Sequence, residues 1–234
     1  AIEFRHNGIE KIIKRLNKDD YAGKEFKVCY QTNGYYDIVP DKLGFKIQYV
    51  PFETCVSRSF IDEFFGEWLD NPIAYGAFED EKLIGFVEGA IEQWNNRFRI
   101  SNICIFEQTA RNNGVGTALI QTILAEAIKT NTRMVVLETQ SCNENAICFY
   151  QKIGFDIIGF DLYSYSNEDP KKHEIRIEMG MKLVKESHIE DMLDEADTET
   201  KNNQERLSHD EVFKAIQSSL KDTTSYTNTV FVSR

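Results

Sequence analysis

The chain has 234 residues, of which 41% are hydrophobic, and its formal net charge is −11. Length and composition predict one soluble domain with an appendage, or at most two small domains, with enough apolar side chains for a core. The sequence holds no block of Lys and Arg, and phosphate binding needs clustered cations. The charge pattern therefore argues against a nucleic-acid surface.

The five cysteines show no C-x-x-C spacing, and the four histidines are scattered along the chain. We therefore expect reduced, mostly structural thiols and no metal site. No apolar run approaches the length of about 18 residues that a membrane-spanning helix needs. These features predict a cytoplasmic protein without membrane contact.

The N-terminal part of the chain carries two helical patterns and one hairpin pattern. Apolar residues at the spacing of one helix face predict two short helices, at residues 9–16 and 59–69. Residues 26–30 and 43–50 resemble strands, and Asn33-Gly34 between them is a turn signal.

From residue 73 onward, strand and helix patterns are clearer. The predicted strands are residues 73–78, 83–93, 98–106, 134–138, 155–165 and 175–184, and the predicted helices are residues 116–130 and 143–153. Antiparallel strands followed by strand-helix-strand-helix-strand predict an α/β domain with a mixed, mostly antiparallel central sheet flanked by helices. We assign this domain to residues 1–184 and an acidic helical C-terminal arm to residues 185–234.

A predicted strand runs into a turn with Gly114 and Gly116, and a helix starts at once. Such a turn aims backbone N–H groups at one point, the helix dipole adds partial positive charge, and Arg111 supplies a cation. These features predict a pyrophosphate cradle. The alternative is a plain strand-to-helix turn whose glycines only solve a packing problem. A dinucleotide-binding Rossmann turn fits less well, because no third glycine is in register.

A second stretch decides between these alternatives. Asn143-x-x-Ala146-x-x-Phe149-Tyr150-x-x-x-Gly154-Phe155 resembles the closing motif of the GNAT superfamily of acyl-CoA-dependent N-acetyltransferases, and Arg111-x-x-Gly114-x-Gly116 resembles the CoA-pyrophosphate motif of that family. The resemblance covers about residues 1–184. It implies the GNAT fold, acetyl-CoA as cosubstrate and direct transfer to an amine. The residues that it implies for CoA binding are Cys104, Ile105, Arg111, Asn112, Asn113, Gly114, Val115, Gly116, Thr117, Asn143, Ala146 and Phe149.

Residues 94–105, 137–140 and 161–165 are similar to the streptothricin acetyltransferase branch of this family. This likeness implies a small cationic substrate with a primary amine, of the streptothricin type. The chain departs from the branch at Ser101 and Asn102, where the branch carries adjacent acids. Neither residue is an anionic partner or a base at neutral pH, so the substrate is open. The substrate-binding candidates are Glu88, Trp94, Ser101 and Asn102, and the aromatic candidates for the pocket or the core are Tyr75, Phe86 and Phe98.

The family resemblance implies that Tyr150 protonates the departing CoA thiolate, whereas the pattern alone also suits a core tyrosine at the end of a helix stripe. Asn143 either holds the cofactor or caps the helix, and both roles are compatible. The general base is open. Glu138 is the first candidate because its Leu-Glu-Thr-Gln context matches the branch; Glu88, Glu92 and a water chain are the others.

The arm has a separate, short likeness. Residues 192–197 and 206–213 resemble the C-terminal part of RelB-type antitoxins, which implies a toxin-like partner or a neighbouring subunit of a homodimer. The alternative is an acidic tail without a partner. A second hypothesis for the whole chain follows: a catalytically weak acyl-CoA-binding module whose arm binds a partner protein.

Overall fold

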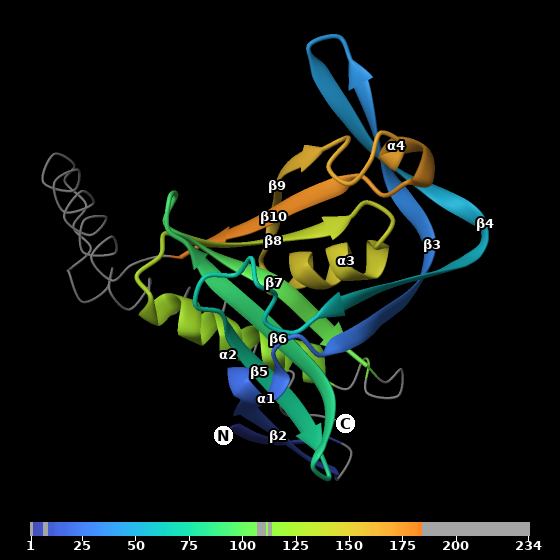
Figure 1. The fold of residues 1–234 in the computed structure, drawn as a ribbon. Coiled ribbons are helices and arrows are strands. Elements are labelled where there is room, and N and C mark those ends of the chain that lie inside the picture. Colours follow the sequence, from blue (N-terminus) through green and yellow to red (C-terminus); the bar gives the residue numbers. More distant parts are fainter. Residues whose placement is uncertain (1, 7–8, 107–110, 112–113, 184–234) are drawn as a thin grey trace, which may run out of the picture. The chain divides into compact units, whose positions relative to one another are not determined.

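The computed structural model describes residues 2–6, 9–106, 111 and 114–183 (Figure 1). The chain divides into two units, Ala1–Leu183 and Val184–Arg234. The predicted arm at residues 185–234 lies outside the described residues, and everything below concerns the first unit.

An eight-stranded sheet forms the centre of the domain (Figure 1). Its strand order is β1-β2-β5-β6-β7-β8-β10-β9, and all neighbours are antiparallel except β7 and β8, which are parallel. The strands are β1 (Ile2–His6), β2 (Ile9–Arg15), β5 (Ile73–Glu79), β6 (Lys82–Glu92), β7 (Arg97–Ile105), β8 (Met134–Gln140), β9 (Asp156–Asp161) and β10 (Arg176–Lys182). The helices are α1 (Lys18–Tyr21), α2 (Val115–Lys129), α3 (Glu144–Ile153) and α4 (Asp169–Lys172). This is the mixed, mostly antiparallel α/β sheet that the sequence predicts.

Apolar side chains project from both faces of the sheet, because successive side chains of a strand point to opposite faces. Val87 belongs to a large core that includes the buried stripes of α2 and α3. Its neighbour Phe86 belongs to a second, aromatic cluster with Phe26, Phe64 and Cys104. The central strand β6 is therefore buried on both faces, which explains its almost continuous apolar run.

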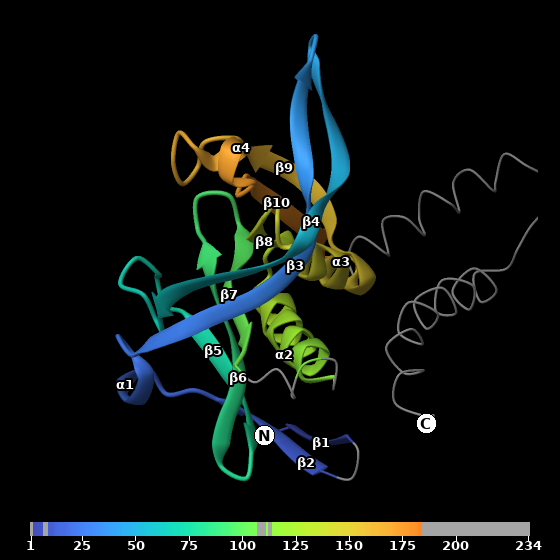
Figure 2. The ribbon, with the colours of Figure 1, turned by 90° about the vertical axis from the view of Figure 1, so that its right-hand side faces the viewer.

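Strands β3 (Glu25–Asp41) and β4 (Gly44–Glu63) form a separate two-stranded ribbon that extends beyond the sheet (Figures 1 and 2). The base of the ribbon packs on the aromatic cluster through Phe26. Its middle is tied to α3, because Glu144 accepts hydrogen bonds from the Asn33 amide at 2.7 Å and from the Tyr49 hydroxyl at 2.6 Å. The ribbon thus crosses the β8–α3 side of the domain.

The ribbon corrects the predicted hairpin. Its turn lies at residues 41–44, where Lys42 has a φ of 52°, and not at Asn33-Gly34. The register of the ladder shifts between Thr32 and Gly34, so the turn signal marks a bulge inside β3.

Both N-terminal helix predictions were wrong. Residues 9–15 form β2, between β1 and β5, and residues 59–63 continue β4, with turns after them. Phe60 and Asp62 pair with Val28 and Phe26 across the ribbon. Their i, i+2 spacing also suits a strand, and pairing with a distant segment decided between the two periods. The predicted elements from residue 73 onward are confirmed, with boundaries that shift by a few residues.

Candidate active site

The parallel strands β7 and β8 begin side by side and then separate. Their ladder runs from Arg97 and Met134 to Ile100 and Leu137, and the described pairing ends there. Among the strands that the structure describes, only β6 pairs with the rest of β7, as far as Ile105. Because backbone N–H groups of a strand alternate between its two edges, amides of this stretch face the gap. The structure therefore opens a polar seam in the middle of its sheet.

A cleft of about 350 Å³ lies at this seam. It is lined from β7, from β8, from the ribbon above and from α3. The lining residues are Val28, Phe60, Asp62, Ile100, Ser101, Asn102, Ile103, Leu137, Glu138, Thr139, Gln140, Asn143, Tyr150 and Tyr165. Among these described residues there are two carboxylates and no Lys or Arg, so the cleft attracts cations.

Glu88 is a fully buried carboxylate beside this cleft, in the middle of β6. Its Oε2 accepts a hydrogen bond from the Phe65 amide at 2.7 Å, and its Oε1 accepts one from Ser101 Oγ at 3.0 Å. Burial raises the pKa of the Glu88 carboxyl, and these hydrogen bonds oppose the rise. A charged group in an apolar strand needs such partners, and β7 and the chain after β4 supply them.

Ser101 and Asn102 turn toward carboxylates. The ladder between β6 and β7 pairs Glu88 with Asn102 and Gly89 with Ile100, so Ser101 is the extra residue of a bulge. The Asn102 amide lies between two acids: it donates to Glu88 Oε1 at 3.5 Å in one orientation and to Asp62 Oδ2 at 3.2 Å in the flipped one. Glu88 of β6 and Asp62 of β4 thus lie beside Ser101 and Asn102, where β7 itself carries no acid.

Tyr150 forms part of the cleft wall and is 7% exposed. Its hydroxyl has no hydrogen-bond partner within the described part of the chain, and burial raises the pKa of its phenol. The phenol therefore keeps its proton at neutral pH. Cys104 of β7 is buried nearby, and burial raises the pKa of its thiol to about 12, so it is a thiol and not a thiolate.

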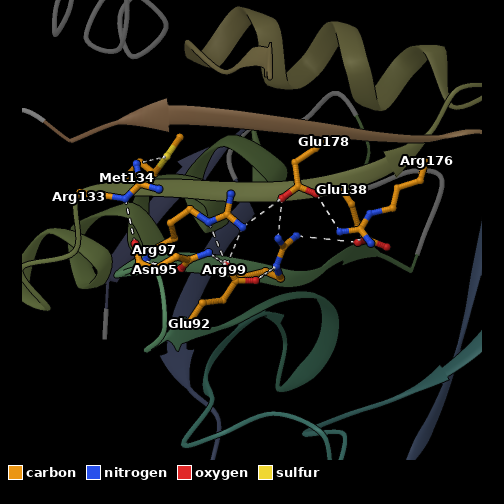
Figure 3. A network of polar contacts seen from close by, with 9 residues as sticks. All are labelled: Glu92, Asn95, Arg97, Arg99, Arg133, Met134, Glu138, Arg176 and Glu178. Carbon is orange, nitrogen blue, oxygen red and sulfur yellow. Dashed lines mark hydrogen bonds and ion pairs between the residues drawn. The ribbon is translucent and has the colours of Figure 1, made fainter. Parts of the chain in front are cut away.

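Glu138 lies in the cleft wall within a network of charges that crosses the sheet (Figure 3). Its Oε2 lies 2.8 Å from Arg176 Nε, and its Oε1 accepts a hydrogen bond from the Tyr165 hydroxyl at 3.3 Å. Arg176 and Arg99 both reach Glu178, and Arg99 also pairs with Glu92. Glu138 and Glu92 are thus carboxylates held by guanidinium groups.

The N-terminus of α2 fits an anion. Gly114 has a φ of 75°, which few side chains tolerate, and caps the helix without a side-chain hydrogen bond. The first described backbone bond of the helix runs from the Ala118 amide to the Gly114 carbonyl, so the amides of Val115, Gly116 and Thr117 precede it. A Cβ on Gly116 would lie 3.3 Å from the Phe149 ring, so glycine lets α2 and α3 approach closely.

Arg111 and Asn143 contact the protein itself. The Arg111 guanidinium donates to the carbonyls of Cys29 and Ile105, the latter at 3.2 Å. Asn143 caps α3, since its Oδ1 accepts from the Ala146 amide at 3.4 Å, and it also lines the cleft. The capping role is confirmed, and the cofactor role stays a prediction. Asn112 and Asn113 lie outside the described residues.

The aromatic candidates do not line the cleft. Trp94 lies between β6 and β7, is 84% exposed and stacks against Arg97 at 5.9 Å. Phe86 and Phe98 are core residues, and Tyr75 is half-buried. The structure therefore does not bring Trp94 together with Glu88, Ser101 and Asn102.

The sequence patterns did not single out several cleft residues. Phe60 and Asp62 come from a segment predicted as a helix, and Gln140 binds the Tyr30 hydroxyl of the ribbon at 2.6 Å. Tyr165 lies within residues 161–165, which only the likeness to the streptothricin acetyltransferase branch indicated. For Phe60 and Asp62 a sequence signal was available: they lie two residues apart, which is the spacing of side chains on one face of a strand.

Within the described part of the chain, no group of three or more metal-ligating side chains occurs. No helix of that part is long and apolar enough to cross a membrane.

A sheet split between two parallel strands, with a glycine-led helix beside the split, agrees with the fold that the family resemblance implies. A model described as "Acetyltransferase (GNAT) family" matches residues 44–155. Streptothricin acetyltransferase A of Bacillus subtilis (strain 168) is 30% identical over 134 residues, which are 53% of this chain and 76% of that protein. The chain therefore belongs to the GNAT acetyltransferase family.

Two further proteins are similar. Streptothricin acetyltransferase of Escherichia coli is 32% identical over 45% of this chain, and the match spans 59% of that protein's length. A crystal structure of a Bacillus anthracis str. Ames protein, assigned as a streptothricin acetyltransferase and in complex with acetyl coenzyme A, has a TM-score of 0.53 and 26% identity; the match covers 74% of this chain and 99% of that one.

The structure of a nourseothricin acetyltransferase shares the fold, with a TM-score of 0.61 and 22% identity over 74% of this chain and 98% of that one.

Proposed function

We propose that the protein transfers an acetyl group from acetyl-CoA to a primary amine of a small cationic molecule. The observation that carries this proposal is the cleft at the separation of β7 and β8. Its wall includes the hydroxyl of Tyr150, and its described lining has carboxylates but no Lys or Arg.

At the thioester end, the residues fit acetyl-CoA. The amides at the start of α2 suit a pyrophosphate; Gly114 leaves open space beside them, and Gly116 lets α3 pack closely against α2. Acetyl-CoA supplies an activated acyl group. The backbone amides of β7 that face the seam stabilise the charge that develops on its carbonyl oxygen. Tyr150 holds a proton at Oη and gives it to the leaving thiolate, and the second proton that the attacking nitrogen loses restores the phenol.

At the amine end, Asp62 gives the cleft a negative charge that draws a cationic substrate, whereas the charge of Glu138 is balanced by Arg176. Phe60 and Tyr165 add aromatic faces on which a cation can rest. Cys104 stays a protonated thiol, so a covalent acyl-cysteine step finds no nucleophile there. Direct attack by the amine is the reaction that this site supports.

A streptothricin-type antibiotic is the substrate that we propose. Two relatives carry the name streptothricin acetyltransferase, and a third similar protein is assigned to the same activity. Residues 185–234 lie outside the described part, so the antitoxin-like arm and the homodimer stay predictions. The cytoplasmic location is likewise part of this proposal.

The test is release of free CoA thiol by the purified chain with acetyl-CoA and a panel of streptothricin, aminoglycosides, polyamines and lysine peptides. Turnover on streptothricin supports the full proposal. Turnover on another amine keeps the chemistry and moves the substrate. No turnover on any amine, with acetyl-CoA still bound in a calorimetric titration, contradicts the enzyme and favours an acyl-CoA-binding module.

A further inference from the structure

We propose that the hydroxyl of Ser101 removes the proton from the acceptor amine and passes it to the buried carboxylate of Glu88. Ser101 is then a catalytic residue at the cleft surface, and Glu88 is a positioning residue that acts through it. The inference rests on the proposed transfer to an amine and names the base that this reaction needs.

Glu88 has the environment of a proton acceptor that substrate cannot touch. It is 0% exposed and does not line the cleft, whereas Ser101 does. One of its oxygens is used by the Phe65 amide at 2.7 Å. The other accepts from Ser101 Oγ at 3.0 Å, and the Asn102 amide approaches it only to 3.5 Å in one of its two orientations. Ser101 is therefore the side chain that links this carboxylate to the cleft.

The bulge in β7 makes this link. Ser101 is the extra residue between the pairs Gly89–Ile100 and Glu88–Asn102. Without the bulge, the regular alternation of β7 would place side chains 100 and 101 on opposite faces of a continuous ladder. With it, the hydroxyl lies within reach of both the Glu88 carboxylate and the cleft.

The proton balance is simple. The ammonium nitrogen of the substrate gives a proton to Ser101 Oγ while the Ser101 Oγ–H proton moves to Glu88 Oε1. The serine hydroxyl is restored, the carboxylate becomes a carboxylic acid, and the nitrogen keeps the electron pair that attacks the thioester carbonyl. After the product leaves, the proton returns through Ser101 to water.

The other cleft carboxylates are less suited to this step. Glu138 is paired with Arg176 at 2.8 Å, so its charge is already engaged by a guanidinium. Asp62 of β4 is half-buried, and its charge is the one that faces Glu88 from the ribbon and helps to raise the pKa of Glu88. Burial makes Glu88 a stronger proton acceptor than an ordinary carboxylate, as base catalysis near neutral pH requires.

The experiment compares Ser101→Ala, Ser101→Thr, Glu88→Gln and Asp62→Asn with the unchanged chain. It measures kcat and KM across pH for the best amine of the panel, and acetyl-CoA affinity by calorimetry. We expect Ser101→Ala to lower kcat by about 10²-fold or more near pH 7, which is the size of a general-base contribution. Acetyl-CoA affinity and KM stay nearly constant, and Ser101→Thr, which keeps the hydroxyl, restores most of the rate.

The pH profile separates a relay from a structural role. The loss of kcat in Ser101→Ala becomes smaller as the pH rises toward the amine pKa of about 10, because free amine then forms in solution without a base. Glu88→Gln gives the same profile if it folds; Ser101→Ala carries the test if it does not. Asp62→Asn is the matched control. It raises KM and moves the pH profile of kcat toward lower pH, because the charge that helps to raise the pKa of Glu88 is gone, but the shape of the profile is kept.

Three results would overturn the relay while acetyl transfer stands. They are a wild-type kcat in Ser101→Ala, equal losses of kcat in Ser101→Ala and Ser101→Thr, and a loss of kcat in Ser101→Ala that is the same at every pH. Loss of the profile in Asp62→Asn would assign the base to Asp62 instead. Absence of turnover by the wild-type chain on every amine would overturn both the relay and the proposed function.

Discussion

Tyr150 combines two properties that usually exclude each other. It is packed among Phe149, Phe155 and the core, yet its hydroxyl has no hydrogen-bond partner within the described residues and belongs to a cleft wall. A buried tyrosine hydroxyl normally finds a partner, so one that has none is available to an incoming group.

Replacement of Tyr150 by Phe keeps the ring and removes only the hydroxyl. We expect kcat for acetyl transfer to fall by about 10²-fold, the scale of a lost general acid, with acetyl-CoA affinity nearly unchanged. Steady-state kinetics and calorimetry measure the two quantities. Tyr163→Phe, at an exposed tyrosine outside the cleft lining, is the control. Equal losses of rate and affinity would contradict the acid role.

At the scale of single elements, the start of α2 depends on one backbone conformation. Gly114 adopts the left-handed region at φ 75°, and open space surrounds the position of an added Cβ. A side chain at this position would strain the backbone but would not collide with any neighbour. The effect of a substitution there therefore reports on the conformation of the turn alone.

Gly114→Ala should cost about 1–2 kcal/mol of stability, the strain of a left-handed non-glycine residue. It also tilts the amides that precede Ala118, so acetyl-CoA affinity should fall. Urea unfolding and calorimetry measure these effects. Gly114→Asn should recover part of both, because asparagine tolerates this region better. Full affinity in Gly114→Ala would show that the turn does not bind the cofactor.

At the scale of the whole domain, a chain of charges joins strands that lie on both sides of the cleft. Glu92 of β6 pairs with Arg97 and Arg99 of β7, and Arg99 reaches Glu178 of β10 (Figure 3). These ion pairs lie at the end of the strands where β7 and β8 are still paired. They therefore stabilise the closed end of the seam while the other end stays open.

This network makes stability depend on pH. Burial alone would raise the pKa of Glu92, but hydrogen bonds and charges from Arg99, Asn95 and Arg97 outweigh burial and lower it. A carboxyl whose pKa is lower in the folded state stabilises the fold above its unfolded pKa of about 4.3, and this contribution is lost as the pH falls through the folded value.

Glu92→Gln should therefore lower the free energy of unfolding by about 2 kcal/mol at pH 7, the scale of a hydrogen bond to a charged group. The difference from the unchanged chain should begin to shrink below about pH 4.3, where the carboxyl is protonated in the unfolded chain, and should go on falling as the pH drops through the lower folded pKa. Urea unfolding at pH 7, 5 and 3.5 measures it. Glu53→Gln, on an exposed ribbon residue, is the control. A difference that persists at low pH would show that the charge is not its source.

The sequence predicted the later half of the fold because its signals are local. Strands and helices from residue 73 onward carry long apolar periods, and the Asn143 cap and the Gly114 turn are set by their own neighbours. The family resemblance at residues 111–116 and 143–155 rests on the same local patterns, and it pointed to the correct fold and to Tyr150.

Only the tertiary structure decided the ribbon and the acidic side of the cleft. The β3–β4 pairing joins residues far apart in the chain and overrides a helical period at residues 59–69. The contact of Glu88 with Ser101 depends on a bulge that no local sequence pattern predicts. Local propensity acts over a few residues, whereas register and burial are set by partners from other strands, which a single sequence does not name.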